Sequence, residues 1–171
     1  PTAPIIGLIT RAFADSPVRI TPFVQDVVDL INAGADIIAV DATARTRPTP
    51  VAHLYDAIRS KGAMAMADCS DLAEGQSAAE MGFDVLGSTM SGYTGQVAAD
   101  GPDLELVRGL SALGKFTVAE GRYHRPDQAA DGIAAGADAV VVGSALTRIE
   151  HATGWFADAV HKAASPQTSP K

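Results

Sequence analysis

Cysteine, positive charge and long apolar runs are all scarce in this sequence, and each scarcity narrows the possible functions. Cys69 is the only cysteine among the 171 residues, which makes an intrachain disulfide impossible and argues against a zinc site built from cysteines. The 13 basic residues are outnumbered by 20 acidic ones, and the net charge of −7 argues against binding to nucleic acid. No apolar run approaches the roughly 20 residues that a membrane-spanning helix needs. We therefore expect a globular protein with neither a nucleic-acid nor a membrane partner.

Familiar motifs for metals, nucleotides and export are also missing. The sequence has no HExxH, Walker or GxGxxG motif, so zinc hydrolysis, nucleotide hydrolysis and dinucleotide redox chemistry lack support. We accordingly expect no metal and no cofactor. Residues Pro1 to Pro4 carry neither the basic flank nor the apolar stretch of a signal peptide, which favours a cytoplasmic location.

Six short apolar runs alternate with segments of helical period, a pattern typical of βαβ units and a parallel sheet. Apolar residues at consecutive positions indicate strands covered on both faces, so we expect all six strands to be interior. The expected strands are 5–9, 36–40, 63–67, 83–87, 116–119 and 139–142. The expected helices are 23–33, 51–60, 72–81, 103–112, 126–135 and about 153–163.

An internal repeat supports an α/β barrel. Gly34-Ala35-Asp36, Gly82-Phe83-Asp84 and Gly136-Ala137-Asp138 each end an expected helix and open an expected strand, so the chain reads as three copies of a double βα unit. We predict a TIM (β/α)8-type barrel over residues 1–163, incomplete because six units are two short of eight, with the missing units preceding this chain or supplied from elsewhere. An open doubly wound sheet is the alternative. Residues 164–171 lack periodicity and are predicted to form a disordered tail.

Polar side chains gather where the expected strands end, which is where both architectures place their active sites. Asp68 and Glu120 each follow apolar residues directly, and partial burial there would raise a carboxyl pKa towards the range useful for acid–base catalysis. The alternative for each is a carboxylate that caps a helix or pairs with arginine. Asp41 either joins the site or only shapes its loop. Cys69 is expected to pack as a small apolar residue rather than to act as a nucleophile.

The last two expected strands end in turns suited to an anion. Gly121 and Arg122 follow one strand, and Gly143 and Ser144 follow the next in a turn whose backbone N–H groups are free to bind phosphate. Arg148 adds a charge-assisted donor. These residues predict a phosphate site, the alternative being that Gly143 and Ser144 simply make a turn. Arg11 and Thr89, at the ends of other strands, complete the candidate binding residues.

The same segments resemble the bacterial N-acetylmannosamine-6-phosphate 2-epimerase family. The likeness runs from Pro4 to about Lys162 and rests on six ordered motifs: IIGLI at 5–9, IAVDAT at 38–43, MAD at 66–68, GST with GYT at 87–94, AEGR at 119–122 and VGSALTR at 142–148. The resemblance implies a cofactor-free β/α barrel enzyme, commonly dimeric, that interconverts N-acetylmannosamine 6-phosphate and N-acetylglucosamine 6-phosphate in amino-sugar and sialic acid catabolism. It implies that Glu120 is catalytic, that Asp68 contacts substrate, and that Arg148 with the Gly143-Ser144 turn binds phosphate.

Two features depart from the family pattern. In the family, the strand that corresponds to residues 5–9 of this chain usually ends in a catalytic lysine. This chain has Thr10 at that position, followed by Arg11. The family's first two βα units, which carry a substrate-binding glutamine and arginine, have no counterpart in this sequence. The interpretations that stay open are the 2-epimerase, another cofactor-free isomerase or epimerase of a sugar phosphate, and a barrel relative that binds a sugar phosphate without turnover.

Overall fold

A computed structural model describes residues 3–95 and 100–164 of the chain. The strands in these ranges are β1 (Ile6–Gly7), β2 (Ile37–Asp41), β3 (Met64–Asp68), β4 (Val85–Gly87), β5 (Phe116–Glu120) and β6 (Ala139–Val141). The helices are α1 (Val24–Asn32), α2 (Val51–Ser60), α3 (Leu72–Met81), α4 (Leu104–Ser111), α5 (Pro126–Ala134), α6 (Ser144–Thr147) and α7 (Ile149–Ala164). None of the helices in these ranges has the length and hydropathy that a bilayer crossing requires.

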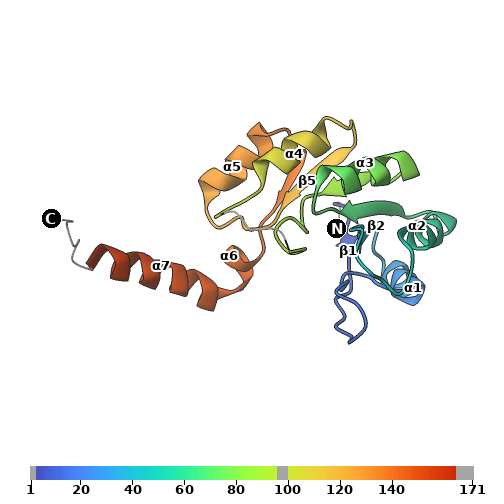
Figure 1. Cartoon of the computed structure of the whole chain (residues 1–171), viewed down its shortest axis with the longest axis horizontal. Coiled ribbons are helices and arrows are strands. Elements are labelled where there is room, and N and C mark those ends of the chain that lie inside the picture. The colour runs from blue at the N-terminus through green and yellow to red at the C-terminus, as the bar shows by residue number, and fades with distance from the viewer. Residues whose placement is uncertain (1–2, 96–99, 165–171) are drawn as a thin grey trace.

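The strands form one parallel sheet in the order β1-β2-β3-β4-β5-β6. A doubly wound sheet reverses its strand order at a switch point. Because the order here never reverses, the chain winds in one sense, as in a TIM barrel, and the doubly wound alternative is wrong. Among the described residues β1 and β6 are the two edges, so the sheet is an open part of a barrel (Figure 1).

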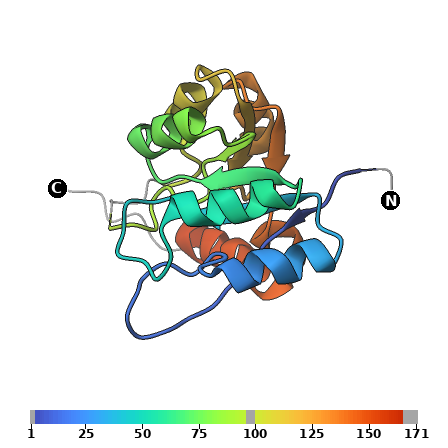
Figure 2. The same cartoon turned by 90° about the vertical axis from the view of Figure 1, so that its right-hand side faces the viewer.

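Side chains on the outer and inner faces of the sheet pack into separate apolar cores. Outward-facing residues such as Ile38, Ala65 and Leu86 pack against α1 to α4, and a further cluster joins β5 to α4 and α5. Inward-facing residues such as Met66 and Val118 form a third cluster on the other face of the sheet. The helices α1 and α2 cover the outside of the sheet in Figure 2. The carboxyl edge of the inner face, beyond this third cluster, is left for a site.

The expectation that all six strands are interior is wrong for the two edge strands. Ile6 in β1 is 39% exposed, and all three residues of β6 are only partly buried. An edge strand has a neighbour on one side alone, so part of its surface stays open in this chain.

The last helix also differs from the expectation, because the chain turns helical at Ser144 and α7 runs from Ile149 to Ala164 with no buried residue. It extends away from the sheet (Figure 1). Ala164 thus ends α7, and the rest of the predicted tail, 165–171, lies outside the described residues.

The Gly-x-Asp repeat has a second structural role that involves its aspartates. Gly34, Gly82 and Gly136 take the left-handed conformation that ends a helix, as predicted. The carboxylates of Asp36, Asp84 and Asp138 then accept backbone N–H groups of Ile5, just before β1, Ala65 in β3 and Thr117 in β5, each at 2.8 Å. Each repeat therefore fixes the register of a strand pair at the end of the sheet opposite the site.

Candidate active site

A cavity of about 620 Å³ lies at the carboxyl ends of the strands. Its volume is in the range typical of small-molecule sites. The cavity brings together most of the predicted site residues, namely Asp41, Thr89, Glu120, Gly121, Arg122, Gly143 and Ser144. Thr10 also lines it. Asp68, Arg11 and Arg148 are not part of its lining.

Glu120 ends β5 and faces the cavity, and both its backbone and its side chain are hydrogen-bonded to neighbouring residues. The Ser88 hydroxyl accepts the Glu120 N–H at 3.0 Å and donates to the Glu120 carbonyl at 2.9 Å. The Thr89 hydroxyl lies 3.2 Å from Glu120 Oε2. Burial raises the pKa of Glu120, and the contact with Thr89 opposes that rise. A positioned carboxyl of this kind is suited to proton transfer with a bound molecule.

Asp68 ends β3 but lies behind the cavity wall, with 1% of its surface exposed. The Thr89 hydroxyl oxygen lies 2.8 Å from its Oδ1, within hydrogen-bonding distance, while Oδ2 is buried without a hydrogen-bond partner. Burial, followed by the negative charges of Glu120 and Asp41, raises the pKa of Asp68 to about 8. This rise in pKa favours the neutral, protonated form of Asp68 near pH 7.

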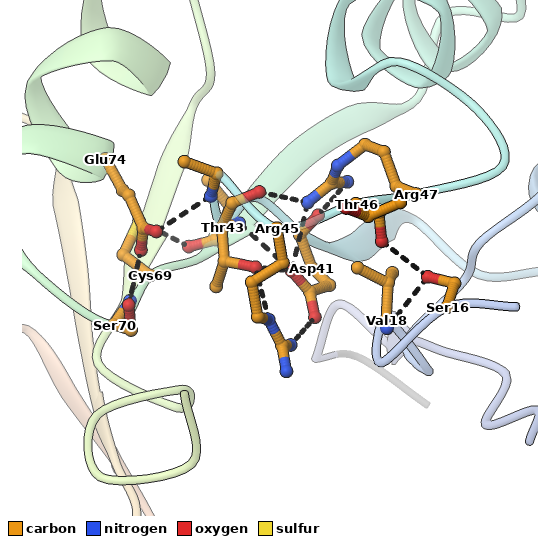
Figure 3. Close-up of polar contacts among 12 residues, drawn as sticks. Ser16, Val18, Asp41, Thr43, Arg45, Thr46, Arg47, Cys69, Ser70 and Glu74 are labelled. Atoms are coloured by element: carbon orange, nitrogen blue, oxygen red, sulfur yellow. Dashed lines mark hydrogen bonds and ion pairs between the residues drawn. The ribbon is translucent and has the colours of Figure 1, made fainter. Parts of the chain in front are cut away.

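Asp41, at the end of β2, is held by its own loop (Figure 3). Its carboxylate accepts the backbone N–H and hydroxyl of Thr43 at 3.0 and 2.6 Å, Arg45 at 2.5 Å and Arg47 at 3.2 Å. Arg47 also donates to the carbonyls of Asp41 and Thr43, and burial lowers the pKa of its guanidinium. Asp41 thus both shapes the loop and contributes to the cavity wall.

The two glycine-bearing turns meet at the β5–β6 side of the cavity. Gly143 and Ser144 open the short helix α6 there, and Gly121 leads into Arg122. Arg122 has a positive φ of 60°, uncommon for a residue with a side chain. Its guanidinium donates to the carbonyls of Gly101 and Ser91. Arg122 therefore fastens the β4–α4 loop at the cavity rim.

Two predicted arginines are engaged elsewhere. Arg11 forms an ion pair with the buried Asp26 of α1 at 2.6 Å, and Arg148 pairs with Glu150 at the exposed start of α7. Cys69 is fully buried in the outer core, and burial raises the pKa of its thiol, so it packs as predicted rather than acting as a nucleophile. In the two described ranges no three His, Cys, Asp or Glu side chains group as a metal site would.

Arg19 is a cavity residue that sequence reasoning missed. The β1–α1 loop folds back so that Arg11 N–H donates to the Arg19 carbonyl at 2.9 Å and Thr10 bridges to Ile20. This brings Arg19 to the cavity beside Thr10. Nothing in the spacing signalled it, because Arg19 stands in the middle of a long loop rather than at a strand end. His124 also lines the cavity, and the centroid of its ring lies 4.1 Å from that of the Trp155 ring.

Comparison with known proteins gives consistent matches over nearly the whole chain. The model of a family described as putative N-acetylmannosamine-6-phosphate epimerase matches residues 2–162. A bifunctional enzyme NanE/NanK of Brucella melitensis biotype 1 is 58% identical over 98% of this chain and 32% of its own length. A putative N-acetylmannosamine-6-phosphate 2-epimerase of Haemophilus influenzae is 55% identical over 94% of this chain and 70% of its own length.

A solved structure agrees with these matches. The N-acetylmannosamine-6-phosphate 2-epimerase from Clostridium perfringens superposes with a TM-score of 0.87 at 40% identity, covering 91% of this chain and 70% of the other. The chain thus spans about a third of the length of the Brucella protein. The fold, the ordered motifs and the family match agree, and the chain belongs to the N-acetylmannosamine-6-phosphate epimerase family.

Proposed function

We propose that this chain carries the catalytic part of an isomerase that interconverts N-acetylmannosamine 6-phosphate and N-acetylglucosamine 6-phosphate, in amino-sugar and sialic acid catabolism. The observation that carries the proposal is Glu120, a half-buried carboxyl that faces the cavity in a chain matched by the family model over residues 2–162. Family membership supplies the substrate class, and the site supplies a group able to perform the chemistry.

Inverting C2 of such a sugar needs proton transfer but no net oxidation. The ring opens to the aldehyde, a proton leaves C2 to give an enolate, and a proton returns on the opposite face. Glu120 serves as the proton-transfer group on one face, because burial brings its pKa closer to neutral pH. The backbone turns at Gly121 and at Gly143-Ser144 face the same cavity and hold the phosphate. Arg122 contributes positive charge at that rim.

The test is proton NMR of N-acetylmannosamine 6-phosphate with the chain in deuterated water. We expect loss of the C2 proton signal and appearance of the gluco epimer carrying deuterium at C2. Glu120→Gln should lower the rate by about 10² to 10⁴, the usual effect of losing a positioned proton-transfer group. Glu80→Gln, the same change at an exposed position on α3, is the matched control and should leave the rate unchanged.

A second candidate function is binding of a sugar phosphate without turnover. It is favoured by Thr10, which lines the cavity where the family resemblance leads us to expect a lysine. Titration of N-acetylmannosamine 6-phosphate by calorimetry separates the two candidates. Saturable binding with no exchange at C2 in the wild-type chain supports the binding protein, and exchange supports the epimerase.

The proposal extends to a homodimer, as the family resemblance implies, and to a cytoplasmic location, as the sequence of residues 1–4 favours. Sedimentation equilibrium of the chain measures the subunit number directly, and a monomer at micromolar concentration would contradict the dimer.

A further inference from the structure

One hydroxyl lies between the two buried carboxyls of the site. Thr89 Oγ1 is 2.8 Å from Asp68 Oδ1 and 3.2 Å from Glu120 Oε2. The three residues come from the ends of β3, β4 and β5, which are consecutive in the sheet. Of the two carboxyls, Glu120 lines the cavity and Asp68 does not. A path of two short contacts therefore runs from the cavity to a carboxyl that solvent does not reach.

The two contacts of the Thr89 hydroxyl limit how many protons the side chains of Asp68, Thr89 and Glu120 hold together. A threonine hydroxyl has a single hydrogen, so it donates to one carboxylate at a time. If both carboxyls were ionised, one contact would join two oxygens with no hydrogen between them. With one extra proton on the pair, both contacts are hydrogen bonds, because the protonated carboxyl donates to Oγ1 while Oγ1 donates to the other. The unpartnered Oδ2 of Asp68 fits a neutral carboxyl, since a buried charge needs partners on both oxygens.

Surrounding charges favour holding this proton on Asp68. On the β2 side stands Asp41, paired with Arg45 and Arg47, and its charge disfavours an ionised Asp68. On the cavity side, Glu120 faces a lining that contains Arg19, Arg122, His124, Tyr93 and Tyr123. Burial is the larger influence on both carboxyls and raises both pKa values.

Gly87 provides the space in which the contact forms. It pairs in register with Asp68 and ends β4 just before Ser88 and Thr89. A Cβ placed on Gly87 would lie 2.7 Å from Met66 Cε and 3.1 Å from both Asp68 Oδ1 and Thr89 Oγ1. A side chain there would press on both atoms of the hydrogen bond, so the missing side chain is part of the arrangement.

We propose that Thr89 relays one proton between Asp68 and Glu120. Glu120 is then a carboxylate when one epimer binds in the cavity and a carboxylic acid when the other epimer binds. In the relay, the O–H bond of Asp68 breaks as its proton passes to Thr89 Oγ1. The hydroxyl proton passes at the same time to Glu120 Oε2, and the charge moves from Glu120 to Asp68. The proton count of the group is unchanged. The use of the two forms rests on the proposed function, in which Glu120 exchanges the C2 proton.

An epimerase needs both forms because it works in two directions. An epimer whose C2 proton points at Glu120 requires the carboxylate, which accepts the proton. The other epimer loses its proton on the opposite face to a second acceptor among the lining groups, such as the imidazole of His124, and requires a protonated Glu120 to deliver one. Thr89 lets the free enzyme interchange these forms without exchanging a proton with solvent. Thr89 acts through Glu120 and is a positioning residue.

Two variants of Thr89 test the relay. Thr89→Val keeps the shape and removes the hydroxyl, whereas Thr89→Ser keeps the hydroxyl. We expect kcat/KM for epimerisation to fall by about 10²-fold in the valine variant and to stay within a few-fold of wild type in the serine variant. The acid limb of the pH profile should move to higher pH in the valine variant, because the Thr89 contact lowers the pKa of Glu120. Unchanged rate and profile in the valine variant, or equal losses in both, would overturn the relay.

A second measurement does not depend on turnover. With the carboxyl carbons of aspartate and glutamate labelled with carbon-13, the Asp68 and Glu120 signals should titrate in shared steps in wild type. The steps should be less strongly coupled in Thr89→Val, where only the charge–charge interaction of the two carboxyls remains. Independent titration in wild type would overturn the relay. Shared titration in a chain that shows no exchange at C2 would support the proton sharing while refuting the proposed epimerase, so the two failures are distinguishable.

Discussion

Replacing Asp68 with asparagine is the sharpest test of the protonation state derived from the structure. In the unfolded chain the carboxyl has its ordinary pKa of 3.8, and in the folded chain burial raises the pKa to about 8. Between these values the folded form binds one more proton than the unfolded form. The stability of the wild-type chain therefore falls as pH rises from about 4 to about 8. Outside that window the contribution of Asp68 to the free energy of unfolding does not change with pH. Asp68→Asn is neutral in both states and lacks this dependence.

The size of the effect follows from the two pKa values. One pH unit corresponds to about 1.4 kcal/mol, and roughly 3 units separate pH 7 from the unfolded pKa. Holding the proton at pH 7 therefore costs the wild-type fold about 4 kcal/mol. The asparagine amide is close in shape to a carboxylic acid and leaves one polar atom in the place of the unpartnered Oδ2. We expect equal stability at pH 4 within about 1 kcal/mol, and a gain for the variant that grows to about 4 kcal/mol at pH 7.

Urea unfolding followed by circular dichroism, repeated from pH 4 to pH 8.5, measures the two stability curves. Asp158→Asn, the same substitution at an exposed position on α7, is the control and should run parallel to wild type. Parallel curves for Asp68→Asn and wild type would mean that Asp68 is ionised in the folded chain, and would refute the reasoning. The variant should also lose turnover, as is common where a site keeps a group that destabilises the fold.

Two further substitutions test the frame around the site. Gly87→Ala should lower the free energy of unfolding by about 1 to 3 kcal/mol through overpacking against Met66, and should also reduce turnover because the added Cβ presses on Asp68 and Thr89. Wild-type values in both urea unfolding and the NMR assay would contradict this. Arg122→Ala should speed limited proteolysis within residues 91–95 and 100–103, since its guanidinium holds Ser91 and Gly101. Arg122→Lys should behave like alanine because it lacks the planar fork, and full rescue by lysine would show that charge alone suffices.

The order of the elements was predictable from local patterns. Consecutive apolar residues marked the positions of the strands, and α3 (Leu72–Met81) matches its expected bounds. The Gly-x-Asp repeat was interpreted as a set of helix ends, which Gly82 confirms with a φ of 104°. The role of Asp84 in tying β3 through Ala65 was not predictable, because it depends on which strands become neighbours. The sequence pattern predicts which face of a strand is buried, but it does not predict which strands pair with each other.

The strand-end rule found the site but not the partner of each side chain. It placed Glu120 and Ser144 correctly on the cavity. It treated Arg11 and Arg148 in the same way, yet their nearest acids are Asp26 and Glu150, and each arginine turns to that acid. Whether a flexible arginine faces a cavity or a local carboxylate depends on distances of a few ångströms, which spacing along the chain does not give.

The different environments of Asp68 and Glu120 follow from the stagger of the sheet. Both are acidic residues that close an apolar strand, so the sequence makes them look equivalent. In the pairing register Asp68 lies opposite Gly87, and Gly87 lies opposite Val118, two residues before Glu120. Asp68 is therefore one inward-facing layer deeper than Glu120, as the tilt of barrel strands requires. Burial at that depth raises the pKa of Asp68, while Glu120 lines the cavity, so one register step gives the two carboxyls different environments.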